Sequence, residues 1–204
     1  MTVGVLTRRG QNKCDGADLA KEILILGNPL LRARSEEVVE FSSDEAKQNI
    51  AETAEALEEF RNAHGFGRGI AAIQIGIQKR IIALNLGEQP FAVINPRITG
   101  RSEETFRMWD DCMSFPDLFV RVKRHTSIDI EYQDENGEPR VWSALDQAAS
   151  ELLQHEIDHL DGILAVDRAI SENDIIYKSE YERNRGLYDG MVDYRIRSTI
   201  RKKG

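Results

Sequence analysis

The sequence predicts an α+β fold in which mixed or antiparallel β-sheets surround one central helix. The middle of the chain is rich in short apolar stretches with strand-like composition, separated by turn residues. Apolar residues recur at helical spacing before this region and again after it. Strands grouped between helices, rather than alternating with them, indicate sheets against which the helices pack. The strand-like stretches are residues 80–86, 91–98, 119–122, 127–132 and 140–142.

A long amphipathic helix is predicted to follow Ser43, whose side chain can act as its N-cap. Ile50, Leu57 and Phe60 recur at helical spacing, and acidic residues occupy the other side. Gly65 ends this segment because glycine adopts the backbone conformation that closes a helix. We expect this helix to pack on the side of the fold opposite the central helix.

The central helix is predicted between residues 145 and 162. Ser143 or Asp146 can serve as its N-cap, and Gly162 is a helix stop. A turn at residues 134–137 joins the last two strands before it. The apolar positions that define the helix are Leu152, Leu153, Ile157 and Leu160.

The chain of 204 residues has the size of one domain with a single sizeable core. Residues 1–20 lack periodicity and are predicted to be a flexible N-terminal extension. Residues 21–170 are predicted to form the catalytic domain. Residues 171–204 are charged and helical in tendency, and we expect them to form a C-terminal helical tail.

Composition restricts the possible partners and the compartment. A formal net charge of −8 argues against a DNA-binding protein, because phosphate contacts need clustered Lys and Arg. Two cysteines far apart in the sequence are typical of a reducing compartment. No apolar run has the length of a signal peptide or a membrane span. We therefore expect a cytoplasmic protein with no membrane contact.

A metal site is predicted on the central helix. His155 and His159 are four residues apart, so both imidazoles project from one helix face and can chelate one ion. Glu156 is placed to act as a general base without being a ligand. The alternative is a chance match on a surface helix, so the motif is insufficient evidence by itself.

A catalytic ion of this kind takes three protein ligands, and Cys112 is the best candidate for the third. It lies among polar residues before a Phe-Pro turn, although a buried structural cysteine is the alternative. His64 and His125 have no partner at ligand spacing, and Cys14 lies in the extension. We treat these three as non-ligands.

Three segments together resemble the peptide deformylase family, in the family's order. They are Gly67–Gln74, Asp110–Ser114 and Gln154–Gly162, and the resemblance covers about residues 22 to 170. It implies hydrolysis of the formyl group from the N-terminal methionine of nascent polypeptides, with formylated peptide N-termini as partners.

The resemblance also assigns the site. It implies that Cys112, His155 and His159 hold the metal and that Glu156 transfers protons. It further implies that the amide of Gln74 and the backbone N–H of Met113 stabilise the oxyanion. A thiolate ligand suits a softer ion, so one divalent ion, Fe(II) or Zn(II), is expected.

Two further expectations come from the resemblance. Arg124 occupies a position where the family often has an arginine paired with the aspartate corresponding to Asp158, so we expect an ion pair between them. Gly67, Arg68 and Gly69, with Asp111, are expected to border the substrate. Two of these positions depart from the family pattern: Arg68 replaces a residue that is usually apolar, and Asp111 replaces a glycine.

These departures keep two alternatives open. A metallohydrolase of the same fold could act on another N-acyl or amide substrate, and a cationic Arg68 would favour an acidic one. A non-catalytic, metal-holding module associated with ribosomes is the other alternative. The basic residues 194–203 could make a weak contact with ribosomal RNA, or they could serve only as a solubilising tail.

Overall fold

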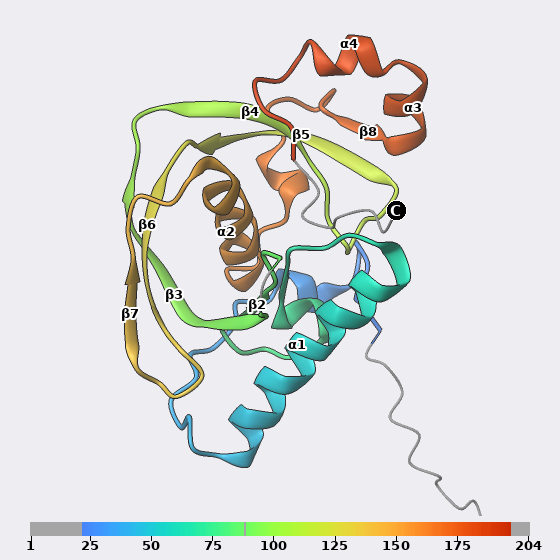
Figure 1. Cartoon of the computed structure of the whole chain (residues 1–204). Helices are drawn as coiled ribbons and strands as arrows, with labels where there is room; N and C mark the ends of the chain where they lie inside the picture. The colour runs from blue at the N-terminus through green and yellow to red at the C-terminus, as the bar shows by residue number, and fades with distance from the viewer. Residues whose placement is uncertain (1–21, 88, 197–204) are drawn as a thin grey trace, which may run out of the picture.

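The computed structural model describes residues 22–87 and 89–196 (Figure 1). The predicted N-terminal extension, residues 1–20, lies outside this range, as does most of the basic C-terminal end. Two antiparallel sheets and two long helices make up most of the fold. The predicted α+β class is confirmed, and the sheets are antiparallel rather than mixed.

The larger sheet has five strands in the order β1-β2-β3-β6-β7. Every neighbouring pair is antiparallel, and β2 pairs with β3 so that Ile81 lies opposite Ile94. The turn predicted at residues 134–137 joins β6 to β7. The strands are β1 (Gly69–Ala71), β2 (Ile81–Leu84), β3 (Phe91–Arg101), β6 (Ile128–Gln133) and β7 (Pro139–Trp142).

Helices cover both faces of this sheet near β2. Ile82 and Leu84 belong to the apolar cluster formed with α2 (Gln147–Leu160). Ile81 and Ala83 point the other way, into the cluster formed with α1 (Asp44–His64). Because successive strand residues face opposite sides, an unbroken apolar run is needed where both sides are covered. The expected placement of the earlier helix opposite the central one is confirmed.

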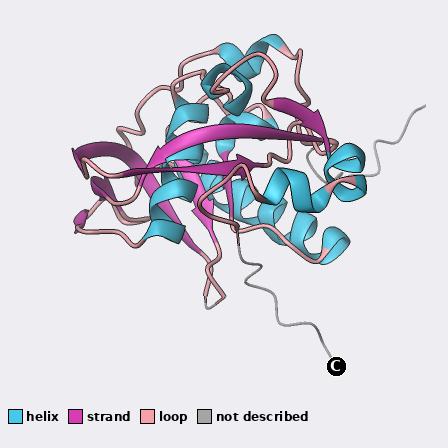
Figure 2. Ribbon diagram, turned by 90° about the horizontal axis from the view of Figure 1, so that it is seen from above, coloured by secondary structure: helices cyan, strands magenta, loops and turns pink. Residues whose placement is uncertain are grey.

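The smaller sheet has the order β4-β5-β8. Its strands are β4 (Thr105–Asp110), β5 (Leu118–His125) and β8 (Ile175–Tyr177). Figure 1 shows α2 enclosed by β3, β6 and β7 on one side and by β4 and β5 above it. Seen from above, long strands cross the molecule with helices on both sides of them (Figure 2).

The two long helices begin and end as their sequences predict. Ser43 Oγ accepts a hydrogen bond from Ala46 N at 3.1 Å, and Gly65 closes α1 at a φ of 74°. Asp146, one of the two predicted caps, accepts from Ala149 N at the start of α2. Residues 149–160 of α2 are all buried, so this helix forms the core of the fold rather than its surface.

Short 3-10 helices connect these elements and lie close to Cys112. They are η1 (Pro29–Arg32), η2 (Ala72–Ile75) and η3 (Ala165–Arg168). Gly76 ends η2 at a φ of 82°.

The prediction of a helical tail from residue 171 is correct only in part. Residues 175–177 form β8, because Ile175, Ile176 and Tyr177 pair with the exposed edge of β5. Two short helices follow, α3 (Lys178–Arg183) and α4 (Arg185–Asp189). We call residues 175–196 the C-terminal cap; its ribbon is the orange and red part at the top of Figure 1.

Among the described residues, no helix combines the length and the apolar character that crossing a bilayer requires.

Candidate active site

Three side chains that could hold a metal ion converge in the core. Cys112 Sγ lies 3.2 Å from His159 Nε2, which lies 3.2 Å from His155 Nε2. All three ligand atoms lie within 4.8 Å of one another, and all three residues are buried. A tetrahedral ion with sulfur at about 2.3 Å and nitrogen at about 2.0 Å would hold its donors about 3.3 to 3.6 Å apart. The donor set and its spacing therefore fit a divalent metal.

The ligands come from two different parts of the fold. His155 and His159 lie one turn apart on α2, as their spacing predicts. Cys112 follows β4, in the loop that leads to β5. The loop fixes the sulfur, because Ser114 N donates to Sγ at 3.4 Å and Phe115 N donates to the Cys112 carbonyl at 3.2 Å.

Glu156 lies next to the first histidine and is only 3% exposed. Its Oε2 has no hydrogen-bond partner among the described residues. Burial raises the pKa of this carboxyl to about 7, and the opposing effect of His155 is smaller. Gly69 in β1 leaves room for it, because a Cβ at this position would lie 3.1 Å from Glu156 Oε1. A buried carboxyl with an open oxygen and a pKa near neutrality can both take up and release a proton.

Gln74 points into the same region from η2. Its Oε1 accepts from Ala71 N at 2.9 Å, which orients the amide. Its Nε2 donates to Ser114 Oγ at 3.1 Å and lies 3.5 Å from Cys112 Sγ. Met113, the residue after the cysteine, lines the same cavity. The structure thus brings Gln74 and Met113 beside the metal-binding side chains.

A network of buried charged side chains contacts His155 on the side away from Cys112 and His159. His155 Nδ1 lies 3.0 Å from Asp110 Oδ2, and Arg124 donates to the same carboxylate at 3.0 Å. Arg124 also donates to Asp158 Oδ2 at 2.5 Å, so the expected pair is present, and Arg168 donates to Asp158 Oδ1 at 2.7 Å. Burial would raise the pKa of Asp110, but His155 and Arg124 together hold it below its usual range.

Asp110 was not predicted as a functional residue. The sequence held a signal for it, since it immediately precedes the Asp111-Cys112 pair at the end of an alternating strand. A carboxylate on the outer nitrogen of a metal-binding histidine fixes the orientation of the ring and which nitrogen faces the metal.

Arg68 is not a free cation in the pocket, contrary to the sequence-based hypothesis. Its Nη2 donates to Glu151 Oε1 at 2.5 Å and its Nη1 donates to the Ala148 carbonyl at 3.1 Å. The side chains are 11% and 2% exposed. Burial raises the pKa of Glu151 to about 7, against the lowering effect of Arg68. Glu151 was also missed, although it lies one helical turn before His155.

Asp111 likewise has a partner that its sequence position did not suggest. The partner is Lys178 of α3, in the C-terminal cap. Its Nζ lies 3.3 Å from Asp111 Oδ2. The site opens into a cavity of about 300 Å³ whose walls include Gly67, Arg68, Gly69 and Asp111. That these four residues border the substrate stays a prediction.

Two residues treated as non-ligands, His64 and His125, lie outside the group of Cys112, His155 and His159. The ring of His64 stacks on Phe60, with centroids 4.2 Å apart. His125 Nδ1 lies 2.7 Å from the Ser102 carbonyl. Cys14 lies outside the described residues.

A family model and several known proteins match most of this chain. The family model described as polypeptide deformylase matches residues 20–174. The peptide deformylase of Thermotoga maritima is 38% identical over 146 residues, covering 72% of this chain and 85% of the relative.

Solved structures share the fold. The crystal structure of the Thermotoga maritima peptide deformylase has a TM-score of 0.67 at 35% identity, covering 74% of this chain and 98% of that one. The peptide deformylase of Synechococcus elongatus in complex with actinonin has a TM-score of 0.69 at 30% identity, covering 85% and 90%.

The residues that the family model matches, 20–174, include all three predicted metal ligands. The chain belongs to the polypeptide deformylase family, and it is a metal-dependent amidohydrolase that removes formyl groups from nascent polypeptides.

Proposed function

We propose that Cys112, His155 and His159 hold one divalent metal ion, beside which Glu156 and Gln74 act on a formylated peptide N-terminus. One observation carries the proposal. Glu156, buried and with an oxygen free of hydrogen bonds among the described residues, lies on the same helix as both histidines and lines the same cavity as Cys112. A structural metal site has no need of such a carboxyl.

The metal would be Fe(II) or Zn(II). One thiolate and two imidazoles are donors that favour these ions over Mg(II) or Ca(II), which prefer oxygen. When bound, such an ion supplies Lewis-acid chemistry, because it polarises a carbonyl group and makes water more acidic.

Glu156 would move the protons of the reaction. It takes a proton from the attacking water, whose oxygen forms a bond to the formyl carbon. It then gives that proton to the nitrogen of the departing amine as the carbon–nitrogen bond breaks. Formate and a peptide with a free N-terminus are the products. The raised pKa of Glu156, about 7, supports both halves of this role.

Gln74 and Met113 would stabilise the negative charge that develops on the formyl oxygen. The Gln74 amide is oriented by the bond from Ala71 N to its Oε1, so that its Nε2 is directed toward Cys112 and Ser114. The backbone N–H of Met113 is the second donor. Donors held in place before the reaction lower the free energy of the transition state without reorganising.

The test is formate release from formyl-Met-Ala by protein loaded anaerobically with Fe(II). We expect release by the wild type and a loss of at least about a hundredfold in Glu156→Gln, as is usual when a general base is removed. Glu59→Gln, an exposed position on α1, is the matched control and should retain full activity. Equal rates in the two variants would exclude the role of Glu156.

Two further proposals concern the setting of the reaction. We expect the enzyme to act in the cytoplasm, where formylated chains leave the ribosome. The basic residues 194–203 are proposed to add a weak contact with ribosomal RNA, supported by the contrast between this segment and the acidic whole. Removing residues 197–204 should then reduce co-sedimentation with ribosomes at low salt. Unchanged co-sedimentation would leave the segment a solubilising role.

A further inference from the structure

The C-terminal cap lines the same cavity as the proposed catalytic groups. Tyr181, Tyr194 and Ile196 of the cap form part of its wall, and Cys112 and Glu156 form another part. The family model ends at residue 174, before the cap begins. The cap therefore borders the proposed reaction site but lies outside the residues that the family model matches.

The cap is fixed to the smaller sheet at three points. β8 extends the sheet by pairing with β5. Trp109 Nε1 at the end of β4 donates to the Tyr188 carbonyl at 2.9 Å. Arg107 Nη2 donates to Asp193 Oδ1 at 2.8 Å, and the chain then runs beside β4, where Tyr194 pairs with Met108. Such attachments make the cap a fixed wall rather than a mobile flap.

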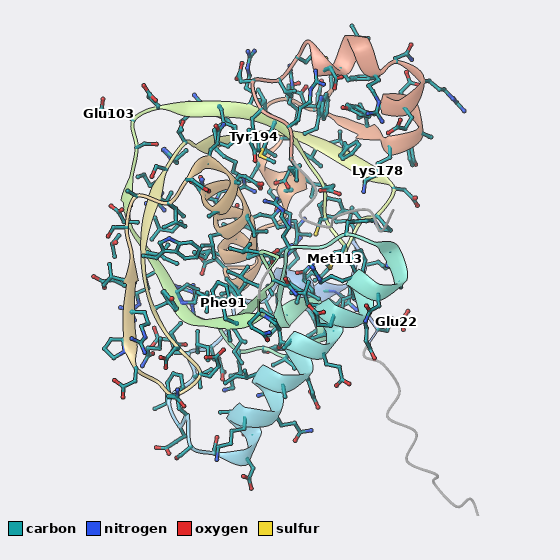
Figure 3. All side chains as sticks on the ribbon, in the orientation of Figure 1. Glu22, Phe91, Glu103, Met113, Lys178 and Tyr194 are labelled. Carbon is teal, nitrogen blue, oxygen red and sulfur yellow. The ribbon has the colours of Figure 1, made fainter. Side chains whose placement is uncertain are left out.

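Lys178 ties the cap to the loop that carries the cysteine ligand. Its Nζ lies 3.3 Å from Asp111 Oδ2, 5.0 Å from the ring centre of Phe119 and 6.0 Å from that of Phe66. Figure 3 labels Lys178 on the cap side of the site and Met113 on the side nearer α1. Asp111, which departs from the family glycine, thus has a structural partner in the cap.

The chemistry of the cap side is aromatic and aliphatic, and its charges are paired. Arg195 Nη1 lies 2.9 Å from Asp189 Oδ2, and Lys178 is paired with Asp111. The exposed aromatic edge continues through Phe66, which is 42% exposed. A wall of this kind favours apolar side chains over charged ones.

We propose that the C-terminal cap binds the second and third residues of the formylated peptide and prefers large apolar side chains there. This inference rests on the proposed function, since the formylated residue must lie beside Cys112 and Glu156. From that position the rest of the peptide leaves through the part of the cavity that the cap borders. Lys178 and Asp111 hold this wall at a fixed distance from the metal-binding loop.

The test compares two amidated peptides, formyl-Met-Ala and formyl-Met-Phe-Leu, the second of which has large apolar side chains at the second and third residues. We expect the wild type to have about a tenfold higher kcat/KM for the longer peptide, mainly through KM, since buried aromatic contacts are worth about this much. Ile196→Ala and Tyr194→Ala should each lower the ratio of the two kcat/KM values by at least about threefold. Leu187→Ala is the matched control, because Leu187 is 65% exposed in α4 and does not line the cavity.

A binding measurement separates this inference from the proposed function. Calorimetry with the deformylated peptides Met-Ala and Met-Phe-Leu should show tighter binding of the longer one, and Ile196→Ala should reduce the difference. If every variant releases formate with the same ratio of the two kcat/KM values, the role of the cap is overturned and the deformylase mechanism stays intact. If the longer peptide binds more tightly but no formate is released, the deformylase mechanism is overturned and the role of the cap stays intact. A faster turnover of the short peptide in Ile196→Ala would also overturn it, because the cap would then obstruct the cleft.

Discussion

Arg68 Nη2 lies 2.5 Å from Glu151 Oε1, and this ion pair forms part of the cavity wall beside the metal-binding side chains. A buried arginine in a substrate pocket suggests an anionic ligand when the sequence is read alone. Its partner, one turn before His155, accepts a hydrogen bond from the guanidinium and ties the residue before β1 to α2. The pair therefore gives the pocket a hydrogen-bonded polar wall, and because the pKa of Glu151 is about 7, the carboxylate neutralises Arg68 above that pH.

Breaking the pair from one side should be more damaging than removing both partners. At pH 8, Arg68→Ala leaves the Glu151 carboxylate buried without its partner, and we expect the free energy of unfolding to fall by about 3 to 5 kcal/mol. The double variant Arg68→Ile, Glu151→Leu should recover most of the loss. Urea unfolding measures both. Arg97→Ala is the control, because Arg97 and Glu37 form an exposed pair, and its effect should stay below about 1 kcal/mol.

The stability of the metal-free protein should depend on pH through Glu151. Burial raises its pKa from 4.5 to about 7, so the folded state binds more protons than the unfolded state between these values. Raising the pH through this window therefore lowers the free energy of unfolding, by at most about 3 kcal/mol. Glu151→Gln has no titrating carboxyl at this position, so this part of the pH dependence should be absent from its free energy of unfolding. If the difference between the wild type and this variant is the same at pH 5 and pH 8, the carboxyl has an ordinary pKa.

Asp110 should govern how tightly the metal is held. Asp110→Asn weakens the support of His155 and leaves Arg124 with one carboxylate fewer, and we expect metal affinity to fall by about 10- to 100-fold. Competition with a chelator measures this without reference to turnover. Asp117→Asn, an exposed position in the following loop, should retain the wild-type affinity. An unchanged affinity in Asp110→Asn would show that the ring of His155 is positioned by its helix alone.

Gly69 should be required for the position of Glu156. A Cβ there would lie 2.9 Å from Leu84 Cδ2 and 3.1 Å from Glu156 Oε1, so Gly69→Ala must displace one or both side chains. We expect kcat to fall by about tenfold or more, since a misplaced base transfers protons poorly. Gly186→Ala meets nothing within 4 Å and should change neither kcat nor folding. Wild-type kcat in Gly69→Ala would mean that Glu156 tolerates displacement.

The two histidines of the proposed metal site could be predicted because their spacing is a local property, whereas Cys112 was chosen as the best third candidate and from the family resemblance. His155 and His159 share a helix face at any position in the fold, and the strong apolar periodicity of α2 placed that helix at its centre. Glu151 could not be chosen in the same way, and the position of Asp110 beside the Asp111-Cys112 pair was a signal without an assigned role. The chain has 35 acidic residues, and only tertiary packing decides which of them are buried beside a cation.

The strands that sequence analysis missed differ in kind. β4 alternates buried Phe106 and Met108 with exposed Thr105 and Arg107, so its signal was present and was overlooked beside the cysteine motif. β8 has three residues in a charged segment, and it is a strand because the edge of β5 offers hydrogen bonds to it. Ile175, Ile176 and Tyr177 themselves favour a strand, but the helix-forming charged residues around them led to the expectation of a helix.

The proposed metal ligands come from segments that lie far apart in the chain, which links metal binding to folding. Cys112 belongs to the loop between two strands of the smaller sheet, whereas His159 lies 47 positions later on the helix that packs on the larger sheet. The full set of three donors exists only when both parts are in place. Tight metal binding is therefore expected only after the smaller sheet has docked on α2, so bound metal would report that the core has assembled.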